Sequence, residues 1–419
     1  MSEKPEKQSE GKNEEKTVEN VEKKSKDILI VIEERKKRAE NLVADETATV
    51  ETPKILTQSK KRTVLSMVFL LVICAVSIII MIVLGSSLSE GSAKSLQEIF
   101  SEMETKYFLF ALVVLFLMLI LDASKFFLIG KVAVGKARAL PSLKVSLLGK
   151  YYDNITPFST GGQAFQIYYL NKKGYSAGQA SAITMIKYFA QMFAWLLVSV
   201  LLMSLCNNAL DGLNANLATT LRVGAWTGFA FNAFLPLTLI LFVILPKFAN
   251  IITAKLVSFL HKIKIIKDKE KIMGKAQKTV KDFKKCFFIM SNRPLYFILL
   301  IFICFFEPIV TLSFPYFLVL AFAKLAPSWD LLINVMALNI FASYAVAIIP
   351  TPGNSGFVET TFTLAFSSIA ASVLFGVTFT WRFLTYYIYI IIGLCITVFE
   401  IIRKFVRAKR QEKALGEKK

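Results

Sequence analysis

The chain has 419 residues, of which 55% are hydrophobic, and 50 Lys and Arg outnumber 30 Asp and Glu to give a formal net charge of +20. A mean hydropathy of +0.54 is too high for a soluble domain of this length. The chain has one histidine, and its cysteines are not spaced as in metal or redox sites. A Ser-His-Asp triad or a metal site is therefore not expected. We therefore expect an all-α, polytopic membrane protein that is not an enzyme and uses no cofactor.

The first 62 residues contain 15 Lys and Arg, 14 Asp and Glu and few aromatic residues. This composition is typical of a disordered, solvated tail. A membrane domain is expected over residues 63–402, with a basic, helical loop at 247–293 and a basic tail at 403–419.

Apolar runs of about 20 residues predict about six to eight membrane spans. The expected spans and shorter apolar helices are residues 64–84, 108–121, 180–205, 223–245, 295–321, 331–349, 356–374 and 378–402. The stretch 125–150 is basic and too polar to cross, and residues 163–171 are expected to form a short returning helix.

The distribution of basic residues predicts the orientation. Residues 123–150 carry six Lys and Arg and no acid, and residues 247–293 carry 13 Lys and Arg against three acids. The positive-inside bias then places both termini and these segments in the cytoplasm, and it predicts a plasma-membrane protein facing anionic lipids. Nucleic acid is not an expected partner, because these basic stretches lack interleaved stacking aromatics.

Two similar stretches interrupt the apolar runs: TPFSTG at 156–161 and TPGNSG at 351–356. Proline ends a helix and glycine permits unusual dihedrals, so both predict broken or re-entrant helices. A cation follows the proline of each stretch by 30 residues, Lys187 in one case and Arg382 in the other. In the predicted orientation the two breaks enter from opposite sides of the membrane, as in an inverted repeat. In transporters built from inverted repeats, broken helices at matching positions form the binding site.

Three charged residues lie within apolar spans, namely Lys187, Glu307 and Arg382. A charge at the bilayer centre costs about 2.5–3.5 kcal/mol, which calls for a reason. One interpretation is a site for an anionic head group, in which the two cations bind phosphate and Glu307 is a counter-ion, with Glu359 as a second acid. The other is a set of structural ion pairs between helices.

The half-helices after the breaks begin near Gly161 and Gly356, and their free N–H groups favour an anion. Thr160 and Ser355 are expected to cap them. Asp122 and Asp153 are expected at the membrane interface, outside the site.

The candidate site combines the buried charges with the polar and helix-breaking residues of both breaks. Asn154, Gln163 and Gln166 could bind head-group oxygens or could satisfy the broken backbone. The full set is Asn154, Thr156, Pro157, Thr160, Gly161, Gly162, Gln163, Gln166, Lys187, Glu307, Pro350, Thr351, Pro352, Gly353, Asn354, Gly356, Glu359, Arg382 and Tyr386.

Two segments resemble a known family. They are NITPFSTGGQAFQIYYL at 154–170, followed by Lys187, and PTPGNSGFVE at 350–359, followed by Arg382 and Tyr386. Together they resemble the flippase-like membrane region of lysylphosphatidylglycerol synthases, whose pattern is N-x-x-P…GG-[DE]-x-x-R, then P-x-P-G-G-x-G-x-x-E and a later Arg. The resemblance implies movement of a lipid or lipid-linked molecule between leaflets.

The chain departs from that pattern at four positions. Gln163 replaces an acid, Gln166 replaces an arginine, Lys187 stands where arginine is usual, and Asn354 replaces the second glycine. These departures bear on which lipid is handled. Only 17 residues follow Ile402, so we expect the flippase part without the family's aminoacyl-transferase domain.

We expect a flippase that moves an anionic or zwitterionic phospholipid or glycolipid, with membrane lipids and an envelope-lipid synthesis enzyme as the expected partners. The absence of a G-x-x-x-x-G-K-[ST] element argues against direct use of ATP. Glu307 or Glu359 could couple transport to ions. The alternatives are a membrane-embedded accessory protein, a lipid-modifying enzyme and a solute transporter.

Overall fold

The computed structural model describes residues 96–244, except 157, 158 and 160, and residues 269–399, together with the isolated positions 79, 255, 258 and 403. In this part of the chain all regular elements are helices, which confirms the predicted fold class. The predictions for the 1–62 tail, the 64–84 span, much of the 247–293 loop and the 403–419 tail fall outside these residues.

Four of the described helical segments are long and apolar enough to cross a membrane, which confirms a polytopic membrane protein. They are α4 (Thr105–Val134), α7 (Ala177–Leu205), α11 (Pro294–Ala323) and the segment Leu374–Phe399. This last segment comprises α14 (Leu374–Arg382), the π-helical turn η4 (Phe383–Tyr387) and the helical residues up to 399.

Two helical hairpins alternate with these long helices. The first joins α5 (Ala139–Ile155) to α6 (Gly161–Lys172) through the first break, and the second joins α12 (Trp329–Ala345) to α13 (Phe357–Ala370) through the second. Successive segments have 30, 17, 12 and 29 residues from α4 to α7, and 30, 17, 14 and 26 from α11 to the last span. The order and approximate length of the elements are therefore repeated.

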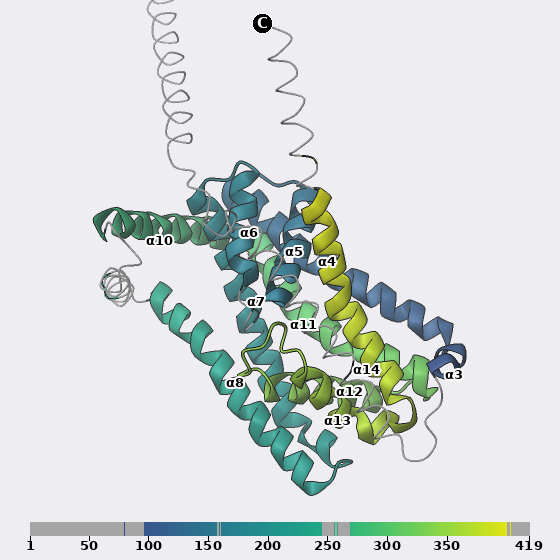
Figure 1. The fold of residues 1–419 in the computed structure, drawn as a ribbon. Coiled ribbons are helices and arrows are strands. Elements are labelled where there is room, and N and C mark those ends of the chain that lie inside the picture. Colours follow the sequence, from purple (N-terminus) through teal and green to yellow (C-terminus); the bar gives the residue numbers. More distant parts are fainter. Residues whose placement is uncertain are drawn as a thin grey trace, which may run out of the picture. The chain divides into compact units, whose positions relative to one another are not determined.

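Each hairpin belongs to its own hydrophobic core. The α5–α6 core contains residues 126–133 of α4, 180–194 of α7 and 300–304 of α11. The α12–α13 core contains the other ends of the same three helices, including Ala111, Met203 and Leu312. Helix α4 thus runs in the opposite direction to α7 and α11, and the hairpins lie at opposite ends of these helices (Figure 1).

The remaining described elements surround this framework. They are α3 (Leu96–Ser101), η2 (Asn207–Leu210), α8 (Ala215–Ile244), α10 (Lys269–Ser291) and η3 (Ala371–Val373). The expected span 223–245 falls largely in α8, and α10 confirms a helix in the C-terminal part of the basic loop. Helix α7 begins at a capping box, in which Ser176 and Gln179 satisfy each other's backbone N–H groups.

Candidate functional site

The second break is closed by a buried clasp made of Arg382, Glu359, Ser355, Gly353 and Gly356. The Nε of Arg382 donates to Oε1 of Glu359 at 2.7 Å, and its Nη2 donates to the Gly353 carbonyl at 2.8 Å and to Ser355 Oγ at 2.9 Å. The other oxygen of Glu359 accepts the Gly356 N–H at 2.7 Å. Both charged side chains are almost wholly shielded from solvent, so the loop satisfies its own polar groups.

This clasp corrects two expectations. The N–H of Gly356 is not free for an anion, because the carboxylate of Glu359 already occupies it. Ser355 is not the cap of α13, because α13 begins at Phe357 and the cap position falls on Gly356; the Ser355 hydroxyl accepts from Arg382. A carboxylate three residues into a helix satisfies the helix N-terminus and complements its partial positive charge.

The first break is closed by a threonine and an aspartate. The N–H of Gly161 donates to Thr156 Oγ1 at 2.8 Å, and the N–H of Gly162 donates to Asp153 Oδ1 at 2.8 Å. Asp153 therefore satisfies a backbone N–H at the start of α6. Ser159, within the break, has a φ of 51° in the left-handed region. The predicted site residues at positions 157 and 160 lie outside the described residues.

A buried cluster of four charges joins three long helices. It consists of Asp122 and Lys125 on α4, Lys187 on α7 and Glu307 on α11. Oδ1 of Asp122 lies 2.8 Å from the Lys187 Nζ and 3.1 Å from the Lys125 Nζ. Lys125 also forms a direct ion pair with Glu307. The two carboxylates and two ammonium groups balance, which reduces the cost of burying them.

Neutral groups extend this four-charge cluster to a fourth helix. The hydroxyl of Ser146 on α5 donates to Oδ2 of Asp122, and the Lys125 Nζ donates to Gln191 Oε1 on α7 at 2.8 Å. Lys125 is fully buried, whereas the Lys187 side chain is 12% exposed. Lys187 is thus the member of the cluster most open to its surroundings.

Two members of the four-charge cluster, Asp122 and Lys125, were not predicted as buried charges. The predicted span ended at residue 121, and Asp122 was expected at the membrane interface. In the structure α4 continues to Val134, and Asp122 and Lys125 are buried inside it. Their three-residue spacing puts both on one helix face, and this spacing was the available signal.

Lys150, near the end of α5, is a second group that the sequence analysis did not single out. It is partly buried. No hydrogen bond or ion pair joins it to another residue in the described part of the chain. Its position four residues before Asn154 puts it on the same face of α5, next to the first break.

Tyr386, in the π-helical turn, brings the two breaks together. Its hydroxyl oxygen lies 3.3 Å from the Asn154 carbonyl and 3.5 Å from the Pro352 carbonyl. The Asn154 side-chain amide donates to the Tyr386 carbonyl at 3.2 Å. The Arg382 guanidinium lies over the Tyr386 ring, 3.8 Å from its centre. Residues about 200 positions apart therefore meet at one tyrosine, in the kind of helix irregularity that is frequent at functional sites.

The other predicted site residues lie around these groups. Thr351 donates to the Ser355 carbonyl at 3.2 Å, Asn354 has a φ of 52°, and Pro350 is exposed. Gln166 is buried and Gln163 is partly buried on α6. The two cations predicted to share a phosphate, Lys187 and Arg382, are bound to different carboxylates. Among the residues described, no group of His, Cys, Asp and Glu could hold a metal ion.

Comparison with known proteins places these features in a family. The sequence matches the family described as the lysylphosphatidylglycerol synthase TM region over residues 62–393. Neither a curated protein nor a solved structure matches the chain. The matched segment contains both hairpins, the clasp and the four-charge cluster. The chain is therefore a membrane protein that belongs to the lysylphosphatidylglycerol synthase TM-region family.

Proposed function

We propose that this protein is a flippase, without enzymatic activity, that moves an anionic or zwitterionic phospholipid or glycolipid between the leaflets of the plasma membrane. The observation that carries the proposal is the contact of two broken hairpins at Tyr386. Irregular backbone at membrane depth is tolerated where it is buried in protein or lines a polar cavity. Two breaks that both lie against one tyrosine would give a lipid head group a polar route between the hydrocarbon-facing helices.

The repeated element order supports an inverted repeat. Both halves read long helix, hairpin, long helix, and the first helix of one half runs opposite to the first helix of the other. In transporters with this symmetry the substrate lies where the repeats meet, and one half moves relative to the other. In our proposal both termini are cytoplasmic, and the α5–α6 hairpin opens to the cytoplasm.

The head group would bind on the side of the first break. Arg382 is held by three acceptors, and Lys125 is enclosed by carboxylates. The side chains of Lys150 and Gln163 are partly buried, and neither side chain has a hydrogen-bond partner among the residues that the structure describes. An ammonium group in this position attracts a phosphate. Lys187, the most exposed member of the four-charge cluster, would be the second cation.

Leaflet exchange in reconstituted vesicles tests the proposal. The assay would follow the loss of protected, head-group-labelled lipid with phosphatidylglycerol, phosphatidylethanolamine, phosphatidylcholine and a glycolipid. The variants are Lys150→Ala and, as a control on the same helix, Lys144→Ala, which removes a partly buried lysine on a different helix face.

We expect head-group-selective exchange by the wild-type protein, lost in Lys150→Ala and retained in Lys144→Ala. Exchange that is equal in all three proteins would exclude Lys150 from the route. Folded protein that exchanges none of the lipids would contradict the flippase and favour a role as an accessory to an envelope-lipid synthesis enzyme.

A further inference from the structure

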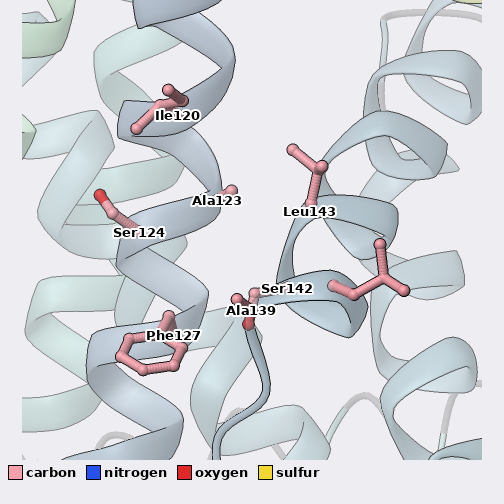
Figure 2. A pocket seen from close by; sticks show the side chains of 8 residues that line it. Ile120, Ala123, Ser124, Phe127, Ala139, Ser142 and Leu143 are labelled. Carbon is pink, nitrogen blue, oxygen red and sulfur yellow. The ribbon is translucent and has the colours of Figure 1, made fainter.

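A groove of about 500 Å³ lies between α4 and α5 (Figure 2). Its α4 side is formed by Ile120, Ala123, Ser124 and Phe127, and its α5 side is formed by Ala139, Leu140, Ser142 and Leu143. The size falls within the range of ligand pockets in proteins.

The groove is chemically a hydrocarbon surface. Its two hydroxyl groups are already used, because Ser124 donates to the Leu121 carbonyl at 2.8 Å and Ser142 donates to the Arg138 carbonyl at 2.9 Å. The other side chains that line it are apolar. Nothing in the groove requires a polar ligand, and each methylene group of a chain placed there would gain the usual benefit of burial.

This groove is separate from the four-charge cluster. Ile120, Ala123, Ser124 and Phe127 follow the i, i+3, i+4, i+7 spacing of one helix face. Asp122 and Lys125 project from the opposite side of α4, where they are buried against α7 and α11. A ligand in the groove would therefore not compete with a head group at the cluster.

Basic residues lie in and next to the α4–α5 turn, close in sequence to the residues that line the groove. Lys131 lies one turn after Phe127, with its Nζ 6.0 Å from the Phe127 ring centre. Arg138 directly precedes Ala139, and Lys136 lies in the same turn, where its Nζ donates to the Gly174 carbonyl at 3.4 Å; all three basic residues are exposed. The segment 123–150 contains no acidic residue. An apolar groove with a basic end is complementary to a lipid that carries a negative head group.

We propose that this groove is a binding site for one acyl chain of an anionic glycerophospholipid, whose phosphate lies at Lys131 and Arg138. The lipid is a bound component of the α4–α5 face. This goes beyond the proposed function, because the site binds lipid whether or not the protein moves lipid between leaflets.

Photo-crosslinking of the full chain in lipid nanodiscs tests the site. The probe is phosphatidylglycerol with a diazirine in one acyl chain, and the crosslinked peptides are identified by mass spectrometry. We expect adducts within residues 120–143, and we expect unlabelled phosphatidylglycerol to displace the probe better than phosphatidylcholine does.

Two variants separate the chain from the head group. Ala139→Phe fills the groove from an exposed position and should abolish these adducts. Lys131→Gln with Arg138→Gln should weaken competition by phosphatidylglycerol by about fivefold for each cation removed, and should leave phosphatidylcholine unaffected. The control, Lys106→Gln with Lys172→Gln, removes two exposed lysines outside the α4–α5 turn and should change neither.

Adducts confined to other segments would overturn the proposed site. If phosphatidylglycerol and phosphatidylcholine displaced the probe equally well, the proposed preference for an anionic head group would be wrong. It would also be wrong if removal of the two cations left competition by phosphatidylglycerol unchanged. Since the adducts are read without any transport, these failures differ from a failure of leaflet exchange.

Discussion

The two breaks share a sequence pattern but are closed by different chemistry. In the second, Arg382 and Glu359 form a buried ion pair that binds the loop and the start of α13. In the first, Thr156 and Asp153 cap α6, and the following cation, Lys187, pairs with Asp122 on another helix. A cation at the same spacing thus fastens a loop in one half and links long helices in the other.

This difference suggests that the two breaks have different roles in ligand binding. A break closed by its own buried ion pair has few polar groups left for a ligand, whereas the first break has the partly buried Lys150 beside it. We therefore regard the second break as the more rigid element and, in the proposed function, the first as the side that meets a head group.

The largest expected effect comes from breaking the clasp. Arg382→Met leaves the buried carboxylate of Glu359 without its cation, and we expect a loss of about 3–5 kcal/mol in unfolding free energy. The double variant Arg382→Met with Glu359→Gln should recover part of it, because no buried charge remains. Chemical unfolding in detergent micelles measures both.

The matched control for the clasp is an exposed ion pair. Lys324 and Glu102 are 3.4 Å apart and roughly half exposed, and Lys324→Met should change stability by less than about 0.5 kcal/mol. Equal costs for Arg382→Met and Lys324→Met would contradict a structural clasp.

The second prediction concerns the close approach of the second break to Tyr386. Gly353 has a φ of 56°, and a Cβ there would overlap the Tyr386 ring. Gly353→Ala should cost more than about 2 kcal/mol, because backbone strain and overlap add. Gly174→Ala is the control, since φ is 89° but the space is open; it should cost about 1–2 kcal/mol. If Gly353→Ala and Gly174→Ala lowered the melting temperature equally, the Tyr386 ring would be able to move away from the added methyl group at no cost.

A smaller effect is expected at the first break. Thr156→Val keeps the side-chain shape but removes the acceptor of the Gly161 N–H, and we expect a loss of about 1 kcal/mol, as for other helix caps. Hydrogen exchange should rise at the start of α6 and stay unchanged in α13. If Thr156→Val lowered the unfolding free energy as much as Arg382→Met does, the two breaks would not differ in how strongly they are held.

Apart from the exposed control pair, the smallest expected effect on stability is that of Lys150→Ala. No direct partner is lost among the described residues, so we expect a change of less than about 1 kcal/mol. Thermal unfolding of the sample used for leaflet exchange would show this. A large destabilisation would reassign Lys150 to the structure rather than to a ligand.

The breaks could be predicted from sequence because proline and glycine act on their own neighbourhood. The stretches 156–161 and 351–356 do separate helix pairs, and the short helix after the first break was placed within a few residues. Hydrophobic runs likewise predicted α7 and α11, because membrane helices need a minimum apolar length.

Ion pairs between helices were one of the two interpretations of the buried charges, but most of the partners could not be assigned because they lie far apart in the sequence. Asp122 and Lys125 ended the predicted span, since an unpaired charge is costly in a membrane. The helix continues because Lys187 and Glu307 reach them from α7 and α11. Arg382 was correctly singled out as buried, but its partner Glu359 follows only from the folding of α13 against α14.

The central claim is that the two hairpins open to opposite sides of the membrane, and cysteine labelling tests it most directly. In a cysteine-free background, Lys173→Cys reports the base of the α5–α6 hairpin and Ala326→Cys reports the base of α12; both positions are exposed. The reagent is a membrane-impermeant maleimide, applied to intact and to opened cells. We predict that position 326 reacts in intact cells and that position 173 reacts only after opening. Labelling of both positions from the same side would contradict the inverted arrangement.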